Sequence, residues 1–173
     1  MRRAYVIHGL IGESLRHMYT NRMTVDTGTG PNLIRYELVP KELRHRIEPC
    51  EDPGMIAASG NNLEFMGTVR IVVRILDFKA RIHFAVVRVL PPGILLGTSF
   101  IDRFVRKIDP RTRLIELQRS RPAPILASVK INHKTKRLHS PKTPNSTIAA
   151  ITEPEPLRPI EDEPDKDKDV PIK

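Results

Sequence analysis

Residues 25–34 read VDTGTGPNLI, and the rest of the chain is interpreted around this stretch. Residues 22–25 predict a short strand, which places the Asp26 carboxylate at the start of a tight loop. Gly28 and Gly30 allow a close backbone approach at that loop. An Asp followed by Thr and Gly at a strand end is usually a turn former that bonds its own backbone. The tripeptide alone therefore predicts a turn, and its context decides whether the carboxylate has a chemical role.

A second motif lies about 70 residues downstream of Asp26. An apolar pair followed by a glycine, at residues 95–97, indicates a short buried strand that ends in a turn. The apolar period then changes to that of a helix over 98–105, with Thr98 or Ser99 available as the capping residue. The DTG loop is thus followed, in order, by paired strands, an apolar-apolar-Gly strand and a helix.

Strand patterns fill most of the sequence around these motifs. In residues 67–76, GTVRIVVRIL, apolar side chains alternate with arginines, which indicates a strand with one solvated face. Residues 82–90 are apolar on both phases near their end and predict a more buried strand. The other predicted elements are strands over 4–11, 94–97 and 114–117 and a short helix over 41–47. We therefore predict a mostly β domain, a small closed β-barrel with one short C-terminal helix.

The sequence changes character after residue 117, because nine of its 16 prolines lie beyond that point. We expect a domain over 1–118 followed by a proline-rich, charged and disordered linker or tail over 119–173. Charge is uneven within that region. Residues 119–142 hold seven Lys and Arg and no acid, whereas residues 153–173 hold eight acids and four bases.

The formal net charge of the 173 residues is +9, of which residues 1–117 contribute +6. A basic run can bind nucleic acid by neutralising phosphates, and the other interpretation is a solvated linker. Aromatic residues make up only 5% of the chain, so stacking platforms for single-stranded nucleic acid are scarce. We favour the linker and keep nucleic acid as the alternative partner.

Composition also argues against several classes of protein. The lone Cys50 allows no intrachain disulfide and no cysteine zinc cage, and it fits a reducing, intracellular compartment. It lies among acids that raise a thiol pKa, so we expect an incidental loop cysteine and not a nucleophile. No apolar run approaches the roughly 20 residues that span a membrane. The six histidines form no ligand-like cluster, so we expect no metal site.

The order of these motifs resembles the retropepsin-like aspartic proteases, most closely the protease of long-terminal-repeat retrotransposons. The resemblance covers roughly residues 4–117. The stretch over 25–34 is similar to the active-site loop of that family. Residues 55–67, MIAASGNNLEFMG, look like its flap hairpin, with Gly60 near the tip, and residues 94–117 look like the segment that closes its fold.

The resemblance implies a mechanism that needs two carboxylates sharing one proton. One of them acts as a base toward water while the other polarises the scissile carbonyl. Because this chain holds a single DTG, the family pattern implies a homodimer in which Asp26 and its symmetry mate form the dyad. It also implies that the Thr27 hydroxyl bonds across the dimer axis and that Gly28 leaves room for the substrate backbone.

The family pattern further assigns substrate contacts and cofactors. Residues 54–66 are expected to fold over the bound peptide, and no metal or organic cofactor is required. Three positions depart from the family pattern. Thr29 stands where retroviral members often carry Ala, and Gly30 replaces a side chain that helps hold substrate in some members. Ser99 stands where Asp or Asn is common, which would weaken a brace under the active-site loop. The residues expected to contact substrate are Thr29, Gly30, Ala58, Ser59 and Gly60.

Two functions of different classes follow from the sequence. The first is a homodimeric aspartic endopeptidase that cuts a retroelement polyprotein, in the cytoplasm or in virus-like particles. The second is a non-catalytic module, either a decayed or repurposed retropepsin-like fold or a basic β-barrel that binds protein or single-stranded nucleic acid. The intact Asp26-Thr27-Gly28 favours the enzyme, and the positive charge of residues 1–117 favours the module.

Overall fold

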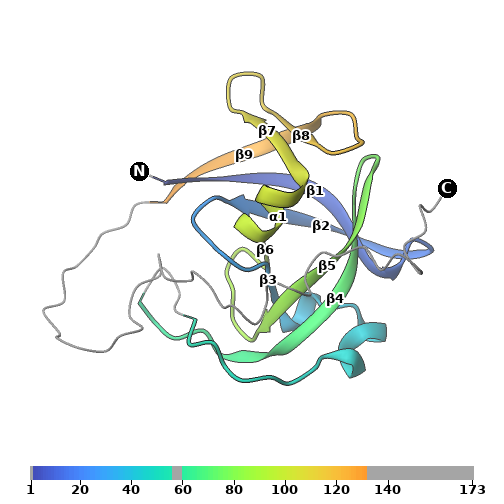
Figure 1. Ribbon diagram of the computed structural model, residues 1–173, viewed down its shortest axis with the longest axis vertical. Coiled ribbons are helices and arrows are strands. Elements are labelled where there is room, and N and C mark those ends of the chain that lie inside the picture. Colours follow the sequence, from blue (N-terminus) through green and yellow to red (C-terminus); the bar gives the residue numbers. More distant parts are fainter. Residues whose placement is uncertain (1, 56–59, 132–173) are drawn as a thin grey trace, which may run out of the picture.

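Two long antiparallel hairpins carry most of the fold in the computed structural model, which describes residues 2–55 and 60–131. The first hairpin joins β1 (Arg2–Ser14) to β2 (His17–Asp26). The second joins β4 (Phe65–Ile75) to β5 (Phe78–Val87), and Figure 1 shows these two strands running side by side. More than half of the residues of β4 and β5 are β-branched or aromatic, and such residues favour the pleated strand conformation.

Two short strands close these hairpins into a barrel. Strand β6 (Ile94–Leu96) pairs in parallel with β2 and antiparallel with β3 (Leu33–Arg35), which in turn pairs in parallel with β5. The circle is completed where β4 pairs with the second half of β1. The six strands follow the closed order β1-β2-β6-β3-β5-β4, so the predicted small closed β-barrel is confirmed.

The barrel interior is filled by the inward phase of each strand. In β4 the core side chains are Val69, Ile71, Val73 and Ile75, as the sequence predicts. The expected solvated face is wrong in part, because Thr68 and Val72 on the other phase are buried as well. Phe100 enters the core from outside the barrel strands, and its ring lies 5.6 Å from that of Phe78. The largest fully buried side chains are Ile7, Ile11, Met23, Leu33, Ile34, Ile71, Ile75, Ile82, Phe84, Ile94, Leu96 and Phe100.

The helices are short. The helix expected after Pro40 forms as the 3₁₀ helix η2 (Lys41–Arg46), preceded by η1 (Tyr36–Leu38). The helix expected over 98–105 forms as α1 (Thr98–Phe104) and ends one residue early. In the described part of the chain, no helix is long and apolar enough to cross a membrane.

Strand pairing explains why α1 ends at Phe104. Val105 has extended backbone angles and begins β7 (Val105–Asp109), which pairs with β8 (Leu114–Leu117). The β-branched Val105 is opposite Leu117 in this hairpin, so its apolar character serves a strand and not the helix face that the spacing suggested.

The predicted domain boundary at residue 118 is wrong. Strand β9 (Ala123–Ile131) pairs with the first half of β1 and, at its start, with β8. Residues 125–130 carry no proline and no acid, and Ile125 is only 7% exposed, so this stretch has enough apolar surface to join the sheet. Averaging composition over residues 119–173 hid this short segment. The expected disorder of residues 132–173 lies outside the described residues.

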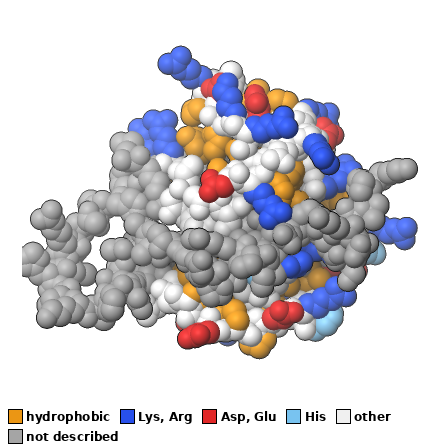
Figure 2. Space-filling view, in the orientation of Figure 1, with side chains coloured by type: hydrophobic (Ala, Val, Ile, Leu, Met, Phe, Trp, Pro, Cys, Tyr) orange, Lys and Arg blue, Asp and Glu red, His pale blue; other side chains and the backbone are white. Residues whose placement is uncertain are grey.

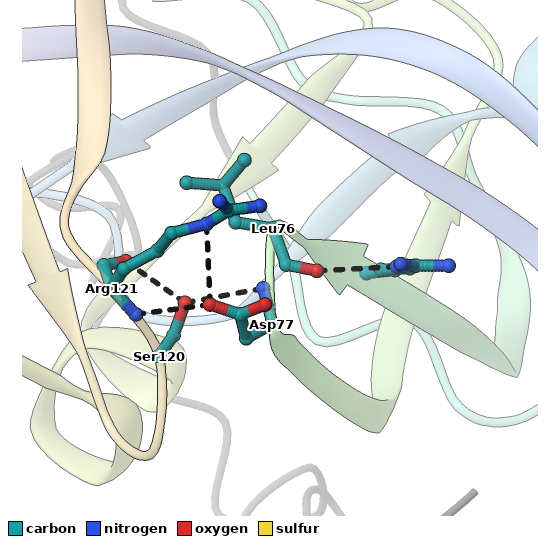
Figure 3. A network of polar contacts seen from close by, with 5 residues as sticks. Leu76, Asp77, Ser120 and Arg121 are labelled. Carbon is teal, nitrogen blue, oxygen red and sulfur yellow. Dashed lines mark hydrogen bonds and ion pairs between the residues drawn. The ribbon is translucent and has the colours of Figure 1, made fainter. Parts of the chain in front are cut away.

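A polar network fixes the entry to β9 (Figure 3). Asp77, in the turn between β4 and β5, accepts a backbone hydrogen bond from Arg121 and forms an ion pair with its guanidinium, both at 3.3 Å. The Ser120 hydroxyl accepts the backbone N–H of Asp77 and donates to the carbonyl of Arg121. These contacts join residues 120–121 to the barrel before β9 begins.

Replacement of Ile125 by Ala is expected to destabilise the protein by about 2–4 kcal/mol, because the change removes a buried side chain of β9 from the core. Leu126 is the matched control. It is 40% exposed, so its replacement by Ala is expected to cost about 0.5 kcal/mol. Urea denaturation measures both free energies of unfolding. Equal, small losses would show that β9 does not pack on the barrel.

Candidate active site

The Asp26 carboxylate is held at the last residue of β2, where the strand gives way to the DTG loop. The Gly28 backbone N–H donates to its Oδ1 at 2.9 Å, and the Thr29 hydroxyl donates to its Oδ2 at 3.0 Å. Asp26 is 4% exposed and Thr29 is 2% exposed. A buried carboxylate is costly unless it is hydrogen-bonded, and here both oxygens are. Thr29 therefore positions the carboxylate of Asp26.

The loop that follows Asp26 is clamped by the start of α1. The backbone N–H of Thr98 donates to the carbonyl of Thr29 at 2.7 Å, and that of Ser99 donates to the carbonyl of Gly30 at 3.0 Å. The Ser99 hydroxyl also donates to Gly30, at 3.0 Å. The first N–H groups of a helix have no partner within the helix, so the loop carbonyls satisfy them.

The expected capping role of Thr98 or Ser99 is wrong. The N-cap residue is Gly97, and the start of α1 has no side-chain cap. Glycine is required here, because a Cβ at residue 97 would lie 2.5–2.6 Å from the carbonyl oxygens of Thr29, Gly30 and Pro31. Ser99, in the position where the family often carries Asp or Asn, still braces the loop through its hydroxyl.

Asn32 joins the loop to two other elements, and the sequence analysis missed this role. Its side chain is 1% exposed and accepts the backbone N–H of Gly97 at 3.0 Å while donating to the carbonyl of His83 at 3.3 Å. Its own carbonyl accepts the N–H of Ala85 at 2.8 Å. The sequence does carry a signal for this role, which is a polar amide directly before the apolar pair Leu33-Ile34 of β3. An amide that is buried beside such a pair needs hydrogen-bond partners for both its oxygen and its nitrogen.

The other two residues of the motif lie nearer the surface. Thr27 is exposed and Gly28 is half-buried, so the loop exposes Thr27 to solvent while Asp26 beside it is buried. Among the described residues, Asp26 is the one buried carboxylate, and no group of three or more His, Cys, Asp or Glu gathers to hold a metal. One chain therefore presents a single positioned carboxylate at this loop.

The segment expected to form the flap is anchored beside the DTG loop. Met55 and Leu63 are joined by a backbone hydrogen bond of 2.8 Å and are both buried. They pack in a small apolar cluster with Leu33 and Leu95. Leu33 begins β3 directly after the DTG loop, and Leu95 lies in β6, two residues before Gly97. The described arms of this segment thus pack at the end of the barrel that holds Asp26.

The tip of this segment is described only in part. Gly60 has a φ of +89°, in the region that favours glycine, and an added Cβ there would meet no atom within 4 Å. The predicted substrate contacts of Ala58 and Ser59 lie outside the described residues. Of the other predicted contacts, Thr29 and Gly30 belong to the clamped loop and Gly60 belongs to the flap-like segment.

Cys50 has the environment that the sequence predicts. It is a free cysteine at the surface, and neighbouring atoms cover part of its thiol. Its partial burial and the neighbouring carboxylates of Glu48 and Asp52 raise the pKa of this thiol above its usual value. A raised pKa lowers the thiolate fraction at neutral pH, which disfavours a nucleophilic role.

Comparison with solved structures establishes the fold. The chain is similar to the retroviral protease-like domain of Ddi1 from Leishmania major, with a TM-score of 0.55 and 13% sequence identity. The match covers 71% of this chain and 95% of that domain. No family model matches the sequence, and no curated protein matches it. The described part of the chain therefore has a retropepsin-like fold.

Replacement of Gly97 by Ala is expected to destabilise the protein by about 3 kcal/mol or more, because the added Cβ collides with the loop carbonyls and has no room to shift. Replacement of Gly60 by Ala is the control, since its cost of about 1 kcal/mol is backbone strain alone. Urea denaturation compares the two. A smaller loss at residue 97 than at residue 60 would contradict the clamp.

Alkylation of Cys50 by iodoacetamide at pH 8 is expected to be slower than that of a cysteine in an unstructured peptide. Replacing Glu48 by Gln and Asp52 by Asn removes two of the three causes of the raised pKa and should speed the reaction. Burial remains, so the variant should stay slower than the peptide. Mass spectrometry gives the rates, and an unchanged rate would show that the carboxylates do not act on the thiol.

Proposed function

We propose that the protein is a homodimeric aspartic endopeptidase whose dyad is formed by Asp26 of the two protomers. The observation that carries this proposal is the immobilised carboxylate of Asp26, bonded by Gly28 and Thr29 within a loop that α1 clamps. An ordinary Asp turn needs only its own backbone bonds. Here the loop is also fixed by a helix start and a buried amide, which is typical of a site that must hold its geometry.

The chemistry needs a second carboxylate, which the described part of one chain does not offer at this loop. A twofold axis that passes beside Thr27 would bring the second Asp26 to the first without any further sequence. Thr27 is exposed in the single chain, so its hydroxyl is available for contact with the partner loop. The paired carboxylates would then share one proton, and the ionised one would take a proton from water as the water attacks the peptide carbonyl.

The substrate is proposed to be an extended peptide within a retroelement polyprotein. The peptide would lie between the DTG loops and the segment over 54–66, whose described arms pack beside Leu33 and Leu95. Gly28 and Gly30 leave space for its backbone. The similarity to a retroviral protease-like domain supports a peptidase of this type. The proposed mechanism needs neither metal nor organic cofactor.

Replacement of Asp26 by Asn is expected to lower peptide cleavage by about 10³-fold or more, because an amide cannot accept the proton of the attacking water. The fold should be retained, since the amide keeps a hydrogen-bond acceptor for the N–H of Gly28. Asp102→Asn, an exposed position on α1, is the matched control and should cleave like the unaltered protein. A mixed peptide library with and without pepstatin supplies the assay. Cleavage that survives Asp26→Asn would exclude Asp26 from the mechanism.

The pH dependence of kcat/KM is expected to be bell-shaped, with its maximum on the acid side of neutrality. Two carboxylates held close together cannot both ionise easily, so the active form is the one that carries a single shared proton. The Asp26→Asn variant should show little cleavage at any pH. A rate that rises steadily to alkaline pH would indicate a different nucleophile.

The second candidate is a non-catalytic module of the same fold, favoured by the net charge of +6 on residues 1–117. Replacement of Asp26 and of surface arginines distinguishes the two functions. A module that binds through its charge would lose affinity when surface arginines are replaced and would be indifferent to Asp26→Asn, whereas the protease would respond in the opposite way.

A further inference from the structure

Strand β9 has one paired edge and one open edge. The paired edge lies against β1 over residues 125–131 (Figure 1). On the other edge, the described residues supply partners only where the strand begins. Strand β8 pairs with residues 123 and 124, and the carbonyl of Arg113 accepts the N–H of Ile125. From residue 126 to residue 131, no described strand pairs with this edge, which we call the open edge.

The side chains along the open edge are also uncovered. Residues 126–130 are all exposed, although they belong to a strand. Leu126 and Val129 are two of the four large hydrophobic side chains that are exposed among the described residues, at 40% and 48%. The backbone and the side chains thus agree that β9 ends in a stretch that the described part of the chain does not cover.

The open edge lacks the features that protect an edge strand. Soluble proteins place charges or prolines on such edges, or cover them with another segment. Residues 125–131 read ILASVKI, with no proline and a single charge at Lys130. By contrast β7, the outermost strand of the sheet, carries Arg106, Lys107 and Asp109 among its five residues. Figure 2 shows charged side chains gathered at the end of the molecule where Figure 1 places β7 and β8. The open edge of β9 therefore fits the covered class.

We propose that residues 145–152 of the same chain pair with the open edge as an additional β-strand. This segment reads NSTIAAIT and lies outside the described residues. It is the longest run within residues 132–173 that contains neither proline nor a charged residue, and four of its eight residues are β-branched. The proposal is independent of the protease chemistry, since it involves neither Asp26 nor the DTG loop.

The two partners are compatible in length, charge and backbone donors. The open edge is six residues long and the segment is eight residues long, so the segment can cover all of it. Lys130 is the only charged residue of the two, so no register places like charges opposite each other. Neither stretch contains proline, so each residue keeps the N–H that a ladder needs. Pro144 and Pro154 flank the segment and would limit the added strand to it.

The connection between the partners is long enough for an antiparallel return. Residues 132–144 separate them, and 13 residues span at most about 45 Å. Six residues of a strand extend over about 20 Å, so the segment can run back along the whole open edge. The connection holds two prolines and four Lys and Arg, a composition that suits a solvated loop.

A second copy of the chain is the other strand that can pair with an open edge. The tethered segment is favoured, because a short flexible linker holds it at an effective concentration of about 1 mM, whereas a second copy must be recruited from solution. The two partners differ in concentration dependence, so the experiment separates them.

Amide hydrogen exchange of the full chain, resolved by residue with NMR, tests the proposal. Within residues 126–131, alternate N–H groups face β1 and the open edge. The groups that face the open edge should exchange about 100-fold faster when both Ala149 and Ala150 are replaced by Pro. Successive N–H groups of a strand point to opposite sides, so one of the two prolines removes a ladder donor in either register. The matched control replaces Asp167 and Lys168 by Pro, which lie outside the segment, and should leave the exchange unchanged.

The groups that face β1 are the internal control, and they should stay protected in all three proteins because β1 pairs with them in each. In the unaltered chain alone, exchange of the outward-facing groups at the rate of an unstructured peptide would overturn the proposal, whatever the variants do. It would also be overturned if their protection survived the two prolines. Protection that rises with protein concentration would assign the open edge to a second copy instead.

Discussion

The contact between the start of α1 and the loop after Asp26 is the constraint on which the site depends. Backbone N–H groups of Thr98 and Ser99 bind the carbonyls of Thr29 and Gly30, and the absence of a side chain at Gly97 permits the approach. These two segments lie about 70 residues apart in the sequence, and β6, which ends just before the contact, closes the barrel by pairing with β2 and β3. The pairing that completes the barrel thus brings the start of α1 to the loop that holds the Asp26 carboxylate.

In the proposed dimer, the site built in this way is half of a catalytic centre. Its single carboxylate is bonded on both oxygens from within its own loop, and Thr27 is left at the surface. A partner of the same sequence is the simplest source of the second carboxylate, because a twofold axis repeats the loop with its geometry intact. The structural similarity to a retroviral protease-like domain fixes the fold and leaves the dimer and its chemistry as our proposal.

Most of the strands and the position of Asp26 at a strand end could be predicted because each depends on a local pattern, and the closed barrel agrees with the family resemblance. Alternation in β4 and the DTG and Leu-Leu-Gly motifs are visible in the sequence itself. The role of Asn32 could not be predicted, because its partners, Gly97 and His83, are brought to it only by the closed barrel. Strand β9 was missed for a related reason. Its stability comes from pairing with β1, and nothing within residues 119–173 indicates which strand edge is available to it.

The central claim, that one active site needs Asp26 from two protomers, is tested most directly by mixing. Unaltered protein and Asp26→Asn protein are unfolded together, refolded at constant total concentration and assayed for peptide cleavage across a range of ratios. If each site requires two intact carboxylates, activity follows the square of the unaltered fraction, and an equal mixture retains about a quarter of the activity. A linear decline, with about half of the activity in the equal mixture, would show that each chain carries a complete site and would contradict the shared dyad.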